Sequence, residues 1–114
     1  MKVKICGLSR PEDIAAVNTA RPDYCGFIVH VPKSRRNVSA DTLRALRADL
    51  ADGIIPVGVF VNEPVESVAD LLESGVLSIA QLHGQEDDAY IAALRARTSR
   101  PIWQAFQIKS AADI

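Results

Sequence analysis

Three stretches of this sequence carry side chains suited to acid–base chemistry or to anion binding. Cys6 closes an apolar run at the N-terminus, where a thiolate could act as a base or a nucleophile if a cation or a helix N-terminus lies nearby. Gln81 and His83 share one face of a later apolar run, because side chains alternate along a strand, and an imidazole exchanges protons near neutral pH. The basic cluster at 33–36 (KSRR) ends in Arg36, whose planar fork matches a carboxylate or a phosphate.

Each of these groups also has an ordinary structural interpretation. Cysteine is among the most often buried residue types, a glutamine within a strand can belong to a structural hydrogen-bond network, and basic runs are usually solvated loops. A functional role is favoured over these structural interpretations, because polar residues gather where the apolar runs end. These residues are Cys6, His30, Asn62, His83 and Gln104. His30 falls on the opposite parity from Phe27 and Val29, and we assign it no role from the sequence.

Short apolar runs alternate with amphipathic segments along the whole chain. We expect strands at 3–6, 24–29, 54–61, 79–82 and 102–106, with starts about 25 residues apart. Helices are expected between them, the first with Pro11 in its first turn and with Ser9 and Glu12 at the spacing of a capping box. Alternating short strands and amphipathic helices predict βαβ units and a parallel sheet.

Two α/β architectures share this pattern: an open doubly wound sheet and an eight-stranded (β/α)₈ barrel. An open sheet of five strands would be complete in 114 residues, whereas eight units need about 200. The barrel is favoured because Gly7-Leu8-Ser9 lacks the GxGxxG spacing, and because polar residues end several different strands. We therefore expect residues 1–114 to be the N-terminal portion of a single (β/α)₈ TIM-barrel domain, about five βα units from strand one to the start of helix five near Ser110.

The composition predicts a soluble, cytoplasmic protein. The chain has 13 basic and 14 acidic residues and a net charge of −1, which gives no case for nucleic acid or an anionic membrane as partner. No uncharged stretch approaches the ~20 residues of a membrane span, and the N-terminus lacks a signal-peptide core. We expect Cys6 and Cys25 to stay free, because opposite ends of adjacent strands lie roughly 13 Å apart. Scattered histidines and cysteines predict no metal site, and no cofactor is expected.

Four motifs resemble those of phosphoribosylanthranilate isomerases, in the order and near the spacing of that family. They are KICGL at 4–8, GFIV at 26–29 with PKSRR at 32–36, VGVFVN at 57–62 and QLHG at 81–84. The resemblance implies a TIM barrel and an Amadori rearrangement in tryptophan biosynthesis, in which a phosphoribosylated anthranilate becomes a 1-deoxyribulose aminoketose. That reaction needs one general acid and one general base, and no redox cofactor or metal.

The resemblance also implies roles for individual residues. Cys6 is the general base, Arg36 holds the anthranilate carboxylate, and Gln81 and His83 line the substrate site. The family's general acid is an aspartate after strand six, and its phosphate loops follow strands seven and eight. The 114 residues include none of these, since Asp113 falls in helix five. We therefore expect the isolated chain to be inactive or nearly so.

Two other interpretations fit the same sequence. One is a small flavodoxin-like or receiver-like domain of five strands that binds a ligand or a partner protein. The other is a half-barrel that self-associates, or pairs with a C-terminal half, through the exposed edges of its first and last strands.

Overall fold

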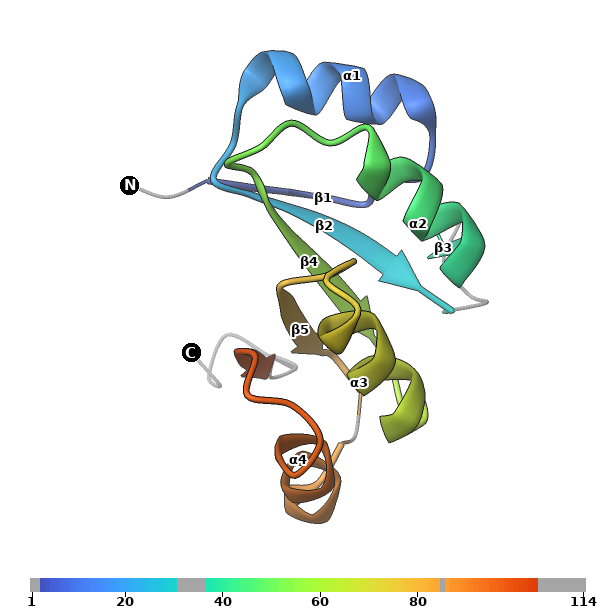
Figure 1. Cartoon of the computed structure of the whole chain (residues 1–114), viewed down its shortest axis with the longest axis vertical. Coiled ribbons are helices and arrows are strands. Elements are labelled where there is room, and N and C mark those ends of the chain that lie inside the picture. The colour runs from blue at the N-terminus through green and yellow to red at the C-terminus, as the bar shows by residue number, and fades with distance from the viewer. Residues whose placement is uncertain (1–2, 31–36, 85, 105–114) are drawn as a thin grey trace, which may run out of the picture.

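The computed structural model describes residues 3–30, 37–84 and 86–104. The strands are β1 (Lys4–Cys6), β2 (Tyr24–Val29), β3 (Asn37–Val38), β4 (Ile55–Phe60), β5 (Ile79–Leu82) and β6 (Ile102–Gln104). The helices are α1 (Pro11–Ala20), α2 (Ala40–Ala48), α3 (Val65–Glu73) and α4 (Asp88–Arg95) (Figure 1). The predicted alternation of strands and helices is confirmed over this part of the chain.

All strand pairs of the sheet are parallel, in the order β1-β2-β4-β5-β6. The short strand β3 was not predicted, because two residues are too few to show the alternation of apolar and polar side chains that is typical of a strand. It pairs with the end of β2 through Ile28↔Asn37 and Val29↔Val38. Since Ile28 also pairs with Val59 of β4, β3 lies on the opposite edge of β2, beyond the point where β1 ends.

The hydrophobic core lies between the sheet and its helices. The helix-facing strand residues Cys25, Phe27, Phe60, Ala80 and Leu82 have no exposed surface. The helices contribute buried side chains that include Ile14, Val17, Leu43, Leu46, Val68, Leu72 and Leu94. Burying this apolar surface is the main force that holds the helices against the strands.

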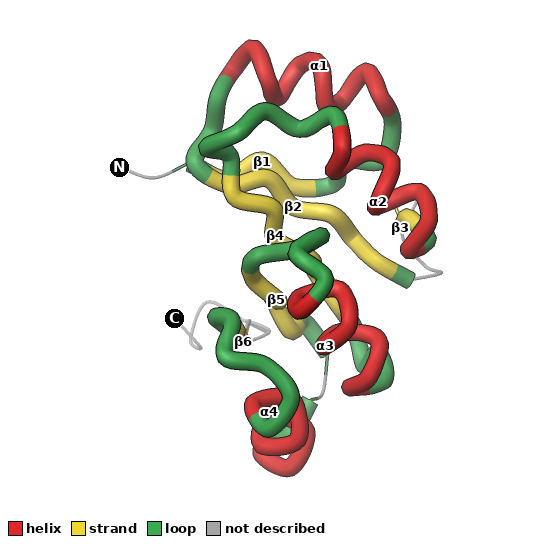
Figure 2. Tube along the Cα trace, viewed as in Figure 1, coloured by secondary structure: helices red, strands yellow, loops and turns green. Residues whose placement is uncertain are grey.

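The sheet is strongly curved, with its helices arranged around the outside (Figure 2). The Lys4 ammonium of β1 donates a hydrogen bond to Oε1 of Gln81 on β5, although β2 and β4 lie between those strands. The rings of Tyr24 on β2 and Trp103 on β6 meet edge to face, with centroids 5.2 Å apart. Side chains of strands that are not neighbours touch in this way only across a concave face. A doubly wound sheet would have helices on both faces, so this arrangement is that of a barrel wall.

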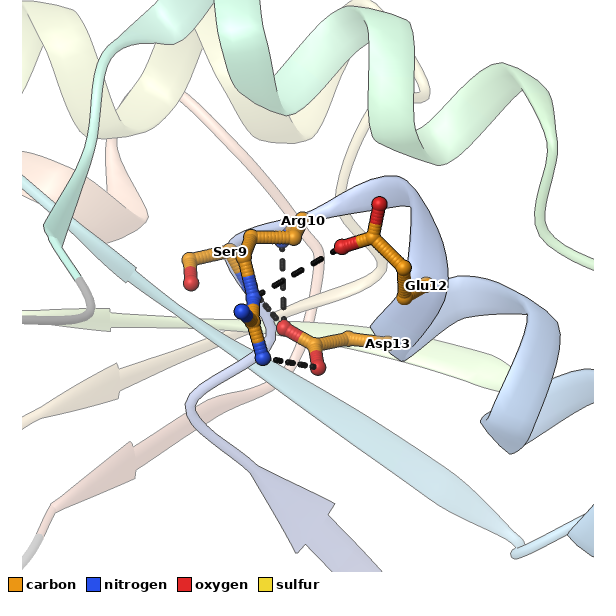
Figure 3. Close-up of polar contacts among 4 residues, drawn as sticks. All are labelled: Ser9, Arg10, Glu12 and Asp13. Atoms are coloured by element: carbon orange, nitrogen blue, oxygen red, sulfur yellow. Dashed lines mark hydrogen bonds and ion pairs between the residues drawn. The ribbon is translucent and has the colours of Figure 1, made fainter.

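Helix α1 begins one residue later than its sequence suggested (Figure 3). Pro11 does occupy the first turn, but Arg10 rather than Ser9 is the N-cap residue. The third helical position is therefore Asp13, and its Oδ2 accepts hydrogen bonds from the backbone N–H of Ser9 (3.0 Å) and of Arg10 (3.1 Å). The predicted capping box of Ser9 and Glu12 is wrong by that one-residue shift.

Two other helices begin at a side chain that caps their first turn. The Ser39 Oγ accepts a hydrogen bond from the Thr42 N–H at 3.2 Å at the start of α2. The Asp87 carboxylate accepts one from the Tyr90 N–H at 2.8 Å at the start of α4. Both side chains satisfy N–H groups that have no partner within the helix.

Candidate functional site

The concave face of the sheet carries Cys6 at the end of β1. This side chain is exposed, and it lies beside Gly26 of β2, its partner in the strand register. A Cβ atom at Gly26 would come 2.7 Å from the Cys6 Sγ and 3.1 Å from the Lys4 Cε. The missing side chain of Gly26 therefore leaves the space into which the thiol and the lysine stem project. The interpretation of Cys6 as a buried core residue does not hold for the described part of the chain.

Gln81 projects from β5 onto the same concave face, where it accepts the hydrogen bond from Lys4. His83 follows two residues later, and its N–H donates to the Phe60 carbonyl at 2.8 Å, which continues the strand pairing. By alternation we expect its imidazole on the Gln81 face at the carboxyl end of β5, and the residue is exposed. The structure thus brings Cys6 and Gln81 to one face of the sheet. Arg36 lies outside the described residues.

The start of α1 does not provide the free positive charge that the sequence suggested for Cys6. The Asp13 carboxylate occupies the N–H groups there, and it contributes a negative charge of its own. The Arg10 guanidinium lies 3.7 Å from the carboxylates of both Glu12 and Asp13 (Figure 3). The positive end of the helix is therefore largely compensated within α1 itself.

The two cysteines are free, as expected, although the predicted reason is wrong. Cys25 pairs with Ile5, next to the pair formed by Cys6 and Gly26, so the two cysteines are close along the sheet. Their thiols stay apart because successive side chains point to opposite faces. Cys25 faces the helices with no exposed surface, and burial raises the pKa of its thiol to about 12. It is therefore inert as a base near neutral pH.

Glu86 joins the ends of β4 and β5, and sequence reasoning missed it. Its side chain is only 7% exposed, and each carboxylate oxygen accepts one backbone hydrogen bond. Oε2 receives the Asn62 N–H at 2.8 Å and Oε1 receives the Gly84 N–H at 2.9 Å. Its backbone carbonyl accepts from the Gln104 side chain at 3.4 Å. The acidic run at 86–88 gave no sequence signal for this role, because the donors to Glu86 lie in two different loops.

His30, to which the sequence assigned no role, pairs with Glu63 at the same edge of the sheet. The Nδ1 of His30 lies 2.7 Å from Oε2 of Glu63, and the Glu63 carbonyl accepts a hydrogen bond of 2.5 Å from the Tyr90 hydroxyl. Burial, with the nearby carboxylates of Glu86 and Glu63, raises the pKa of Tyr90 to about 12. These contacts join the ends of β2 and β4 to α4.

A hollow of about 210 Å³ lies between β1 and α1. Its lining comprises Ile5, Cys6, Leu8, Asp13, Ala16, Val17 and Ala20, so Cys6 also borders this hollow beside α1. In the described parts of the chain, no group of three or more His, Cys, Asp or Glu side chains could hold a metal ion. No helix within those parts is long and apolar enough to cross a membrane.

Comparisons with known proteins agree on one family. The family model of N-(5'phosphoribosyl)anthranilate (PRA) isomerase matches residues 3–114. An N-(5'-phosphoribosyl)anthranilate isomerase of Endomicrobium trichonymphae is 42% identical over 108 residues, which cover 95% of this chain and 53% of that protein. One of Clostridium kluyveri is 41% identical over 114 residues, which cover 100% of this chain and 55% of that protein. The chain thus spans about half the length of the curated relatives it matches.

Solved structures give the same result. Phosphoribosyl anthranilate isomerase of Thermus thermophilus matches with a TM-score of 0.81 and 34% identity, over 96% of this chain and 54% of that chain. A phosphoribosyl anthranilate isomerase in complex with reduced 1-(o-carboxyphenylamino)-1-deoxyribulose 5-phosphate matches with a TM-score of 0.81 and 31% identity, over 99% and 57% of the two chains.

Proposed function

Since this chain belongs to the N-(5'-phosphoribosyl)anthranilate isomerase family, we propose that residues 1–114 form the N-terminal portion of one (β/α)₈-barrel domain of such an isomerase. The curved parallel sheet with helices on its outer side supports this assignment. The observation that carries it is the placement of Cys6 and Gln81 on the concave face, with Lys4 between them. The flavodoxin-like alternative has no support in this geometry, because an open sheet has no such face.

The reaction is the conversion of N-(5-phosphoribosyl)anthranilate to 1-(o-carboxyphenylamino)-1-deoxyribulose 5-phosphate. Protonation of the ring oxygen breaks its bond to C1 and leaves an iminium at C1. Loss of the C2 proton to a base then gives an enolamine. Protonation at C1, with loss of the proton from the C2 hydroxyl, gives the ketose. Every step is a proton transfer or a bond shift, so the reaction needs an acid and a base but no electron carrier.

Cys6 is the base in this proposal, because it is the exposed titratable group at the carboxyl end of β1. Gln81 and His83 line the substrate, and Arg36 holds the anthranilate carboxylate, by the residue-by-residue resemblance. Counted as barrel strands, β1, β2, β4, β5 and β6 are the first five. By the resemblance, the general acid and the phosphate loops follow the sixth to eighth barrel strands of the family, which these 114 residues do not include. The chain by itself is therefore expected to be inactive or nearly so.

The test is an isomerase assay on the chain alone and on the chain mixed with the C-terminal half of a relative, such as that of Thermus thermophilus. Conversion of the aminoaldose to the aminoketose is followed by NMR. We expect turnover only in the mixture, and a loss of about 10²-fold or more with Cys6→Ser. Cys25→Ala is the matched control and should retain turnover, because that thiol is on the other face. A Cys6→Ser mixture as active as the wild type would refute the assignment of the base.

We also propose that the chain associates, either with a C-terminal half or with a second copy. β1 and β6 are the terminal strands of the described sheet, and the concave face exposes 36% of Ile55, together with parts of Tyr24 and Trp103. Unpaired parallel edges and an apolar face favour association. Size-exclusion chromatography of the chain alone and of its mixture with the C-terminal half should show a species larger than 12.3 kDa. A 12.3 kDa monomer in both samples would refute this proposal.

The proposed compartment is the cytoplasm. Both cysteines are free, and two unpaired thiols suit a reducing environment.

A further inference from the structure

Lys4 is a charged side chain on the concave face that the proposed function does not use. It lies on β1, two residues before Cys6, so both side chains project from the same side of the strand. Its ammonium donates to the neutral amide oxygen of Gln81. It forms no ion pair with any residue in the described ranges. A half-buried ammonium whose only described partner is neutral favours a nearby anion.

The charge of Lys4 lies close to the Cys6 thiol. The Lys4 Cε would be 3.1 Å, and the Cys6 Sγ 2.7 Å, from one and the same point, a Cβ placed on Gly26. The ammonium nitrogen is one bond beyond Cε. Its charge therefore acts on the sulfur from within the screening length of about 8 Å at physiological salt.

Two other described sources of positive charge on the chain just after Cys6 are already compensated. The N-terminus of α1 is occupied by the Asp13 carboxylate, and Arg10 faces Glu12 and Asp13 (Figure 3). Lys4 is thus the described cation that acts on this face without an acidic partner. The oxygen it contacts belongs to Gln81 of β5, so the charge of Lys4 lies between β1 and β5 on the concave face.

We propose that Lys4 is the anion-attracting residue of the concave face: its ammonium draws an anionic carboxylate ligand toward the Cys6 sulfur. The proposal rests on the isomerase function above, in which Cys6 removes a proton and the substrate is anionic. Lys4 acts through the local electrostatic potential, and it is a positioning residue in that sense.

The experiment compares alkylation of the chain by iodoacetamide, which is neutral, and by iodoacetate, which carries a carboxylate. Only the thiolate reacts. Cys25 is buried and has a pKa raised to about 12, so labelling at pH 7.5 reports Cys6, and Cys6→Ala should abolish it. Because both reagents attack the same thiolate, the ratio of their rates depends on the potential around the sulfur and not on how much thiolate is present.

At low salt we expect Lys4→Met to lower the iodoacetate-to-iodoacetamide ratio about threefold, while Lys4→Arg keeps it near the wild-type value. The matched control is Arg44→Met, which removes one positive charge from the exposed side of α2 and should leave the ratio unchanged. In the wild type alone, 0.5 M salt should lower the ratio toward that of Lys4→Met. This arm keeps the test valid if the Met variant misfolds, which labelling of Cys25 would reveal.

An equal ratio in wild type and Lys4→Met, or an equal loss in Arg44→Met, would overturn the proposal. A wild-type ratio insensitive to salt would also overturn it. None of these readouts needs turnover. A failed isomerase assay with the expected ratios would therefore count against the proposed function alone, and unchanged ratios beside recovered turnover would count against Lys4 alone.

Discussion

Replacing Glu86 by alanine removes the acceptor that joins the ends of β4 and β5. Glu86 is 7% exposed, and its carboxylate accepts hydrogen bonds from the N–H groups of Asn62 and Gly84. A hydrogen bond to a charged group contributes about 1.5–3 kcal/mol net. The lower figure applies to each bond, because Asn62 is exposed and Gly84 only half-buried, so water can reach both donors. We therefore expect Glu86→Ala to lower the free energy of unfolding by about 3 kcal/mol, a large fraction of the total for a small domain.

Urea denaturation followed by circular dichroism measures this loss, and hydrogen exchange locates it. The amides of Asn62 and Gly84 should exchange faster in the variant, while those in the middle of β2 should not. Glu86→Gln should lower the free energy of unfolding by about half as much, because the amide oxygen can still accept one of the two hydrogen bonds while the NH₂ group faces the other donor. Glu66→Gln is the matched control: that side chain is 65% exposed in a surface pair with Arg97, and its loss should stay below about 0.5 kcal/mol. A Glu86→Ala variant as stable as this control, with unchanged exchange, would refute the reasoning.

Three other changes test the packing and the buried thiol. Gly26→Ala places a methyl group 2.7 Å from the Cys6 Sγ, so urea denaturation should show a loss of about 1–3 kcal/mol and Cys6 should alkylate more slowly; normal alkylation would contradict the geometry. Gly58→Ala places a methyl group 2.8 Å from the Phe60 ring and should lower Tm through a similar loss of about 1–3 kcal/mol, whereas an unchanged Tm would show that the core yields. Burial raises the Cys25 pKa from 9.0 to about 12, so between these values the folded thiol keeps a proton that the unfolded one releases. Stability should therefore fall as pH rises, by about 1.4 kcal/mol between pH 8 and pH 10. Cys25→Ala should abolish that loss in urea denaturation, and an equal loss in both proteins would argue against a buried neutral thiol.

Much of the local structure could be predicted from residues that are neighbours in the chain. β2 and β5 have the predicted bounds, because both are short runs of mostly apolar residues that end at a histidine. α2 and α4 begin after Ser39 and Asp87 because those side chains cap N–H groups three residues away. Alternation along β5 correctly put Gln81 on the concave face, and the motifs correctly identified the family.

The tertiary structure alone decided which groups meet around that face. The contact of Lys4 with Gln81 spans 77 residues and depends on the curvature accumulated over four strands. The two hydrogen bonds to the Glu86 carboxylate depend on the loops after β4 and β5 lying side by side. No sequence pattern predicts either of these contacts. Sequence by itself determined the order of strands and helices, because capping and alternation act over a few residues. The partners of Lys4 and Glu86 were decided only when the twisted strands assembled, because twist adds up across a sheet and not along a single strand.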